Sequence, residues 1–156
     1  MTETHTPLVS VIVPTFNQKP EYLRATIRSV LAQDFDDFEL VVSDNHSIAE
    51  TAAVMNEFDD ERLHVVHPPE HLPMIPHFSF AAEQGRGKYL SFLPSDDLVE
   101  PDWLSTLVPA IERDEDASFA FGEIMGVVHD APETVLYTCR DNKLASGTYD
   151  PEFLLK

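Results

Sequence analysis

Residues 8–17 read LVSVIVPTFN, and they are the strongest indication of the kind of sheet this chain forms. Its first six residues are nearly all apolar and rich in β-branched side chains, which is typical of a strand buried on both faces of a parallel sheet. Pro14 is expected to end that strand, because proline cannot donate to a sheet ladder. Pro20 stands where a first helical turn would begin. Apolar residues at helical spacing over 23–31 then predict a helix.

The same alternation of apolar runs and amphipathic segments continues along the chain. Further strands are expected at 38–42, 63–66 and 88–93, and further helices at 47–58, 76–84 and from Pro101 onward. Strands and helices joined by short links predict an α/β protein with an open, mostly parallel sheet and helices on both faces. The length of 156 residues fits one domain spanning 1–156.

Several residues punctuate these elements. Ser47 and Glu50 have the spacing of a capping box at a helix start. Gly85 and Gly87 are expected to terminate the helix over 76–84, and Pro109 should kink the last helix. Beyond residue 117, SFAFGEI and TVLYT are β-like, and the final GTYDPEFLLK resembles a helix entry.

Charge restricts the classes of partner. The chain carries 28 acidic and 10 basic side chains, a formal net charge of −18, so it repels nucleic acid at long range. A phosphate-bearing ligand would need a local cation, for which a carboxylate-held divalent metal is the candidate. Cys139 is the only cysteine. That cysteine and the lack of an apolar run of about 20 residues favour a cytoplasmic protein with no membrane span in this chain.

Candidate site residues follow the predicted strands. In open α/β sheets, ligands bind beyond the carboxyl ends of the strands. Those ends carry small polar groups and three carboxylates, in the stretches Pro14-Thr15-Phe16-Asn17, Ser43-Asp44-Asn45 and Ser95-Asp96-Asp97. The three carboxylates are therefore expected to converge on one rim of the sheet.

The Asp96–Asp97 pair has the chemistry of a divalent metal site. Mn²⁺ or Mg²⁺ prefers oxygen ligands, and one or two carboxylates suffice when substrate phosphates and water complete the shell. The acidic pairs at 36–37 and 59–60, by contrast, are ordinary surface features, and Asp44 could simply cap a helix. His64, His67 and His71 do not share a helical face, so a zinc site is not predicted.

Four motifs together resemble a known family. VSVIVPTFNQ, SVLAQDF, FELVVSDNHS and GKYLSFLPSDDLVEPDWL occur in an order that closely resembles family-two glycosyltransferases of the GT-A, Rossmann-like fold. The resemblance covers residue 8 to about residue 112. It implies an inverting enzyme that uses a nucleotide-diphospho-sugar, most often a UDP-sugar, with a glycan or lipid-linked acceptor.

The resemblance also implies roles for individual residues. It suggests that Thr15 and Asp44 lie near the base and ribose, Asp96 near the ribose, and Asp97 on the metal. Pro14 and Asn17 belong to the same nucleotide-sugar-binding stretch, and His77 takes the place of a donor-facing residue on a family helix. Pro94 departs from the family pattern, which often has an acid there, and this leaves the metal with fewer ligands.

The catalytic base is expected beyond Lys156, because in this family it lies in the second, acceptor-binding half. The chain is accordingly interpreted as a donor-binding fragment, truncated after that half, which transfers sugar poorly or not at all by itself. Two alternatives remain open: a noncatalytic nucleotide-sugar-binding module, and another α/β enzyme such as a metal-dependent nucleotidyltransferase or phosphatase. The sequence makes no prediction of the oligomeric state.

Overall fold

A computed structural model of the chain describes residues 5–122, 124–128 and 131–138. The chain divides into two compact units, 1–105 and 106–156, which are described separately. The first unit alternates strands and helices, as the sequence predicts. Its elements are β1 (Val9–Thr15), α1 (Pro20–Leu31), β2 (Phe38–Asp44), α2 (Ala49–Met55), β3 (Leu63–Val66), α3 (Met74–Glu83) and β4 (Tyr89–Phe92).

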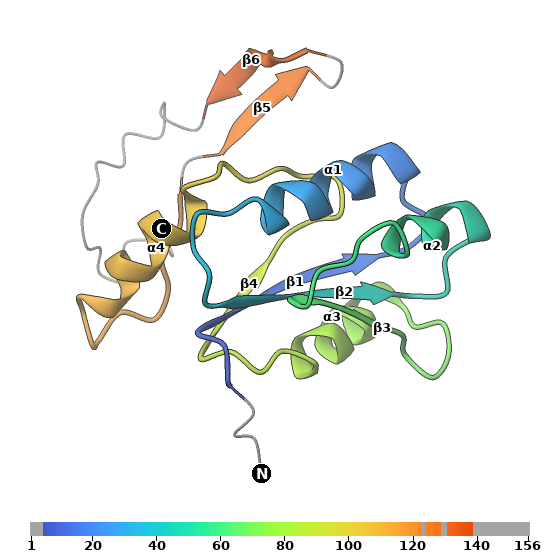
Figure 1. Cartoon of the computed structure of the whole chain (residues 1–156), viewed down its shortest axis with the longest axis horizontal. Coiled ribbons are helices and arrows are strands. Elements are labelled where there is room, and N and C mark those ends of the chain that lie inside the picture. The colour runs from blue at the N-terminus through green and yellow to red at the C-terminus, as the bar shows by residue number, and fades with distance from the viewer. Residues whose placement is uncertain (1–4, 123, 129–130, 139–156) are drawn as a thin grey trace. The chain divides into compact units, whose positions relative to one another are not determined.

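The four strands of the first unit form one parallel sheet in the order β3-β2-β1-β4. Helices α1 and α2 lie over one face of this sheet and α3 lies over the other (Figure 1). Strand β1 is central, and the chain returns from β3 across the sheet, through α3, to add β4 on its far side. The predicted α/β architecture is confirmed.

The core occupies both faces of the two central strands, and each strand is buried along its whole length. Ile12 and Val41 pack with Ala81 of α3 on one face. Successive strand residues point to opposite faces. The residues on either side of Ile12 and Val41 in the sequence therefore pack on the other face of the sheet. There the helix α1 buries its predicted stripe, of which Leu23, Ile27 and Val30 are 0% exposed.

The prediction that Pro14 ends the first strand is wrong. Strand β1 continues to Thr15, and Pro14 is paired in register with Ser43 of β2. The opposite side of Pro14 faces β4, but the β1–β4 ladder ends at the pair Ile12 and Phe92. Since no strand residue of β4 lies opposite Pro14, the missing N–H breaks no ladder hydrogen bond.

The predicted capping box at Ser47 is also wrong. Helix α2 begins at Ala49, has no side-chain hydrogen bond at its N-cap, and ends at Met55 rather than near Phe58. Ser47 Oγ instead accepts a hydrogen bond from the backbone N–H of Asn17 at 2.8 Å. A residue that matches a local capping pattern is thus used for a contact between two loops.

Gly85 and Gly87 do not terminate α3 by adopting positive φ. They allow the turn after α3 to approach β1 closely. A Cβ on Gly87 would lie 2.6 Å from the backbone nitrogen of Ser10, and a Cβ on Gly85 would lie 2.7 Å from a side-chain carbon of Leu90. Glycine is required here for space rather than for backbone freedom.

Helix α4 (Trp103–Glu112) begins in the first unit and continues into the second, with Pro109 inside it. The second unit also contains β5 (Met125–Val128) and β6 (Ala131–Thr138), which pair antiparallel. TVLYT falls within β6 as predicted. The predicted strand SFAFGEI is not formed over its described residues 118–122 and 124. The expectations for Cys139 and for GTYDPEFLLK lie outside the described residues.

Among the described residues, no helix combines the length and apolar character that crossing a bilayer requires.

Candidate functional site

The carboxyl ends of the four parallel strands form one edge of the sheet, here called the carboxyl edge. It carries Thr15 at the end of β1, Asp44 at the end of β2, His67 directly after β3 and residues 93–97 after β4. Because β2 and β4 lie on opposite sides of β1, this edge has a topological switch point between β1 and β4. Open α/β sheets bind ligands in the crevice at such a point.

Asp44 is buried at the carboxyl edge and is held by two loops. The residue is 2% exposed, and its Oδ1 accepts a hydrogen bond from the backbone N–H of Ser47 at 3.2 Å. His67 Nδ1 lies 3.4 Å from Asp44 Oδ2 and 3.1 Å from the Asp44 backbone oxygen. In register, Asp44 stands beside Thr15. Its carboxylate is therefore fixed in position, as a group that orients a ligand must be.

The loops after β1 and β2 are tied together by left-handed residues. Asn17 has φ 51° and His46 has φ 63°. Asn17 Oδ1 accepts a hydrogen bond from Ile48 N at 2.8 Å, and its own N–H donates to Ser47 Oγ. Non-glycine residues with a left-handed backbone are strained and persist only where surrounding contacts hold them. Such residues are concentrated at functional sites. Asn17, predicted as a nucleotide-sugar ligand, thus also shapes the edge through its side-chain oxygen.

A pocket of about 250 Å³ opens between the ends of β1 and β2, the loop before α3, and the start of α3. Asn45 shapes it, because its side chain donates to Leu72 O at 2.8 Å and accepts from Leu72 N at 2.9 Å. The rings of Phe16 and His71 stand 4.6 Å apart, tilted by 47°. The lining residues are Pro14, Thr15, Phe16, Asn45, His71, Leu72, Pro73, Met74, His77 and Phe78.

Thr15 lines this pocket and carries a buried hydroxyl that is unpartnered. The residue is 2% exposed, and its Oγ1 has no hydrogen-bond partner within the described part of the chain. A buried hydroxyl without a partner costs about 1–3 kcal/mol. A buried polar group without a partner calls for an explanation, and a ligand bound at the adjacent pocket that supplies the missing bond is one.

His77, predicted to face a ligand, also lines the pocket but is mostly buried. It is 4% exposed, and its Nε2 lies 3.0 Å from Ser43 Oγ. Burial lowers the pKa of His77 below its usual value, although Ser43 and the charge of Asp44 act in the opposite direction. The ring is therefore neutral at pH 7, and one of its two nitrogens is occupied by Ser43.

Asp96 and Asp97 stand exposed on the loop after β4. The N–H of Asp97 donates to Pro94 O at 3.1 Å, which closes a turn, and Gln18 Nε2 donates to Ser95 Oγ at 3.4 Å. The pKa of Asp97 is raised, first by partial burial and then by the negative charge of Asp96. A bound cation would relieve that repulsion, so the pair fits a divalent ion.

The three predicted carboxylates share one edge but do not gather into one metal cluster. Within the described residues, no group of three or more His, Cys, Asp or Glu side chains is arranged to hold a metal. Strands β2 and β4 are separated by β1, and two strand spacings amount to about 9–10 Å. Asp44 and the pair Asp96–Asp97 therefore flank the end of β1 from opposite sides.

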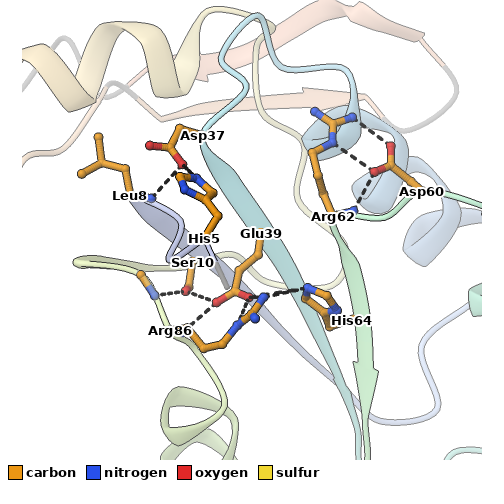
Figure 2. A network of polar contacts seen from close by, with 10 residues as sticks. His5, Leu8, Ser10, Asp37, Glu39, Asp60, Arg62, His64 and Arg86 are labelled. Carbon is orange, nitrogen blue, oxygen red and sulfur yellow. Dashed lines mark hydrogen bonds and ion pairs between the residues drawn. The ribbon is translucent and has the colours of Figure 1, made fainter. Parts of the chain in front are cut away.

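A larger cavity, of about 890 Å³, lies at the other edge of the sheet. We call this the amino edge, since it carries the amino ends of the strands. Its size does not make it the better candidate, because its charged groups are largely paired with one another (Figure 2). The lining residues are His5, Pro7, Asp36, Asp37, Phe38, Glu39, Asp59, Asp60, Glu61, Arg62, His64 and Arg86.

Comparison with known proteins identifies the family of this chain. The sequence model of the family described as "Glycosyl transferase family 2" matches residues 10–142, which is most of the chain. The chain belongs to glycosyl transferase family 2. The resemblance inferred from the four sequence motifs is thereby confirmed.

Relatives of this family 2 chain are longer than it is. It is 40% identical over 115 residues to the O-antigen biosynthesis protein RfbC of Myxococcus xanthus, an alignment that covers 70% of this chain and 9% of RfbC. Among eight curated relatives, the aligned share of the relative ranges from 9% to 42%. The chain thus spans less than half of their length.

Solved structures confirm the GT-A fold of this family 2 chain. S. aureus TarS in complex with UDP-GlcNAc matches with a TM-score of 0.60 and 29% identity, over 67% of this chain and 31% of that one. The mannosyltransferase PcManGT from Pyrobaculum calidifontis, in complex with GDP-Man and Mn²⁺, matches with a TM-score of 0.63 and 24% identity. That match covers 80% of this chain and 36% of PcManGT, and it supports the fold alone.

Sequence reasoning assigned no individual role to several residues of the carboxyl edge in this family 2 chain. Phe16, expected at this edge, is a 50% exposed aromatic residue directly after a buried strand, and this contrast could have indicated a role. Asn45, His67 and His71 act through contacts 23–27 residues away. No local pattern in the sequence announces such contacts.

Proposed function

We propose that this chain binds the nucleotide-diphospho-sugar donor of a glycosyltransferase at its carboxyl edge. The whole protein would transfer the sugar to a hydroxyl of a glycan or lipid-linked acceptor with inversion. The observation that carries the proposal is the unpartnered, buried hydroxyl of Thr15, a residue that lines a pocket at the end of the central strand. Family membership supports the choice of donor class.

The nucleoside end of the donor is assigned to the pocket beside Thr15. Phe16 and His71 line this pocket and offer ring faces against which a base can stack. Asp44 does not line the pocket, but it stands beside Thr15 in register and offers a carboxylate at the same strand ends. Stacking is tolerant of base identity, whereas a fixed carboxylate accepts hydrogen bonds from base N–H or ribose O–H groups. Pro14, Asn17 and His77 would shape this pocket around the nucleoside.

The diphosphate is assigned to the side of the edge that carries β4. Asp97 would hold Mn²⁺ or Mg²⁺, with Asp96 beside it toward the ribose and the metal. A metal bound there would neutralise charge that develops on the leaving diphosphate. Burial, and after it the negative charge of Asp96, raise the pKa of Asp97, so a cation bound beside the two carboxylates would be favoured.

A UDP-sugar is the favoured donor. Solved TarS structures, about 30% identical to this chain, are in complex with UDP and with UDP-GlcNAc. The O-antigen biosynthesis protein RfbC suggests a polysaccharide pathway for the whole protein. The proposal assigns no described residue to the catalytic base of the inverting transfer.

Isothermal titration calorimetry tests the proposal. UDP, UDP-GlcNAc, GDP and UTP are titrated into the chain with and without Mn²⁺, with uridine as the ligand that lacks phosphate. We expect UDP to bind more tightly with Mn²⁺ and uridine binding to be independent of Mn²⁺. A preference for UTP over UDP would favour a nucleotidyltransferase, and the absence of binding to every nucleotide would reject the proposal.

A further inference from the structure

A buried carboxylate at the amino edge links strands β1, β2 and β3 to the turn before β4. The side chain of Glu39, in β2, is 3% exposed. Its Oε1 accepts hydrogen bonds from Ser10 Oγ of β1 at 2.6 Å and from the backbone N–H of Arg86 at 2.7 Å. Its Oε2 accepts from Arg86 Nε at 2.8 Å and Nη2 at 2.6 Å. Figure 2 shows these contacts converging on the one carboxylate.

Two more hydrogen bonds extend the network to both sides. Ser10 Oγ accepts a hydrogen bond from the backbone N–H of Gly87 at 2.7 Å, which ties the turn before β4 to β1. Arg86 Nη2 donates to Nε2 of His64, in β3, at 3.0 Å. We call this set, Ser10, Glu39, His64, Arg86 and Gly87, the Glu39 network.

Charge-assisted hydrogen bonds keep the network in one arrangement. Burial alone raises the pKa of Glu39, but the hydrogen bonds from Ser10 and Arg86 outweigh it and leave the pKa below its usual value. The carboxylate therefore stays ionised, with Oε2 accepting from two guanidinium nitrogens of Arg86 and Oε1 from its backbone N–H, and these charge-assisted contacts are directional. The turn over residues 85–87 is held against β1 at van der Waals distance, where only glycine fits at position 87.

Strand β4 needs such an anchor because its own residues specify its register weakly. It has four residues and pairs with β1 alone in the described sheet. Leu90 is 49% exposed and Phe92 is 43% exposed, so a slip would not move a fully buried set of side chains into water. Register is poorly fixed where neither face of a strand is fully buried.

We propose that Glu39 and Arg86 are remote positioning residues for the metal-binding side of the donor site, because they fix the register of β4 on β1. The inference rests on the proposed function for the role of Asp96 and Asp97. The register pairs Val9 with Tyr89 and Ile12 with Phe92, and the acids follow within five residues. A slip by one residue displaces them by about 3.3 Å, whereas a binding constellation must be held within about 0.5 Å.

The nucleoside side of the site does not depend on this anchor. Thr15 and Asp44 belong to β1 and β2, which are paired over seven buried residues each. Disturbing the Glu39 network should therefore weaken binding that depends on the metal while leaving the binding of uridine unchanged. A purely structural network would affect both alike.

Arg86→Gln is the variant that tests the proposal, and Arg62→Gln is its matched control. Arg62 lies at the same edge and also contacts one carboxylate through two nitrogens, with Nε 3.0 Å and Nη2 2.8 Å from Asp60. It contacts the loop before β3 and α1, not β4. Should Arg86→Gln fail to fold, Ser10→Ala removes the link to Gly87 with a smaller change.

The first readout is calorimetric affinity for UDP with and without Mn²⁺, and for uridine. We expect Arg86→Gln to reduce the Mn²⁺-dependent gain in UDP affinity by about tenfold, as for residues that orient metal ligands. Uridine affinity should not change, and Arg62→Gln should leave both values as in the wild type. Equal losses for UDP and uridine, or an unchanged gain in Arg86→Gln, would overturn the proposal.

The second readout does not involve a metal. Amide hydrogen exchange of the unliganded chain is followed at Tyr89 to Leu93, which bond to β1. We expect at least about tenfold faster exchange there in Arg86→Gln, with β1–β2 amides unchanged. Uniform exchange changes would overturn the register anchor. If the wild type shows no Mn²⁺-dependent binding, the proposed function fails. The exchange measurement still shows whether the Glu39 network fixes the register of β4.

Discussion

The two edges of one parallel sheet use their polar residues in opposite ways. At the amino edge, the buried Glu39 is satisfied by four hydrogen bonds at 2.6–2.8 Å. At the carboxyl edge, Thr15 is equally buried but its hydroxyl has no partner within the described residues. Asp96 and Asp97 there are exposed. The ionised form of Asp97 is disfavoured by partial burial and by the charge of Asp96, which raise its pKa. The amino edge is thus built for stability, and the carboxyl edge leaves polar groups available to a ligand.

Removing the buried carboxylate should have the largest effect. We expect Glu39→Ala to lower the free energy of unfolding by about 3 kcal/mol, because Ser10 and the turn at Arg86 lose their acceptor. Urea denaturation measures the change. Glu57→Ala is the control, since Glu57 makes an equally short two-point contact with Arg24 but is 41% exposed at the surface. If the two variants lose the same stability, burial does not distinguish the amino edge.

Asp97→Asn should have the next largest effect, and it should act on binding alone. Loss of one of two carboxylate ligands is expected to weaken UDP binding in Mn²⁺ by about 100-fold. Stability should rise slightly at pH 7, because the partial burial of a charged carboxylate and its repulsion by Asp96, which together raise the pKa of Asp97, both disappear. Calorimetry and thermal unfolding measure the two quantities. Asp102→Asn is the control, an exposed acid whose side chain is assigned no role.

Two hydroxyl deletions on β1 should change stability in opposite directions. Ser10→Ala breaks a satisfied pair at the amino edge and is expected to destabilise by about 1 kcal/mol. Thr15→Val removes an unpartnered hydroxyl at the carboxyl edge and is expected to stabilise by about 1 kcal/mol. Thr15→Val should at the same time weaken uridine binding. Denaturation curves for both variants decide the matter, and destabilisation by Thr15→Val would show that its hydroxyl is satisfied.

The two edges should also respond to acid in different pH ranges, with the smallest effect of the four. The pKa values of His77 and Glu39 are both lowered in the folded chain, so each contributes stability above its unfolded pKa that is lost as pH falls. The loss begins below about pH 6.5 for His77 and below about pH 4.3 for Glu39.

Nuclear magnetic resonance spectra recorded between pH 7 and pH 4 measure this difference. The resonances of the His77 ring and of the neighbouring Ser43 should shift before the side-chain carboxyl resonance of Glu39 does. Simultaneous change at both edges would contradict the assignment. In His77→Gln, the early step should be absent while the later one remains, which attributes the first step to this side chain.

The sequence predicts the sheet well because its signals are local. The apolar run before Pro14 and the stripe of Leu23, Ile27 and Val30 each arise from a period that one element imposes on its own residues. Parallel topology then places the strand ends at a common edge without further information. That reasoning located Thr15, Asp44 and Asp97 at the same edge of the sheet.

The remaining features could not be predicted because they depend on distant partners. Ser47 matches a capping box but is used by Asn17, which lies 30 residues earlier. Glu39 stands inside an apolar run, and a charge in such a place does signal a buried partner. Its partner Arg86 lies 47 residues later, however, and no spacing rule connects the two.

Paramagnetic relaxation by Mn²⁺ tests the central claim most directly. Amide spectra of the ¹⁵N-labelled chain are recorded with trace Mn²⁺ before and after UDP is added. We predict UDP-dependent broadening centred on Ser95, Asp96 and Asp97, and extending to Thr15 and Asp44. Broadening centred instead on the acids at 36–37 and 59–61 of the amino edge, or a pattern that UDP does not change, would contradict a metal-assisted donor site at the carboxyl edge.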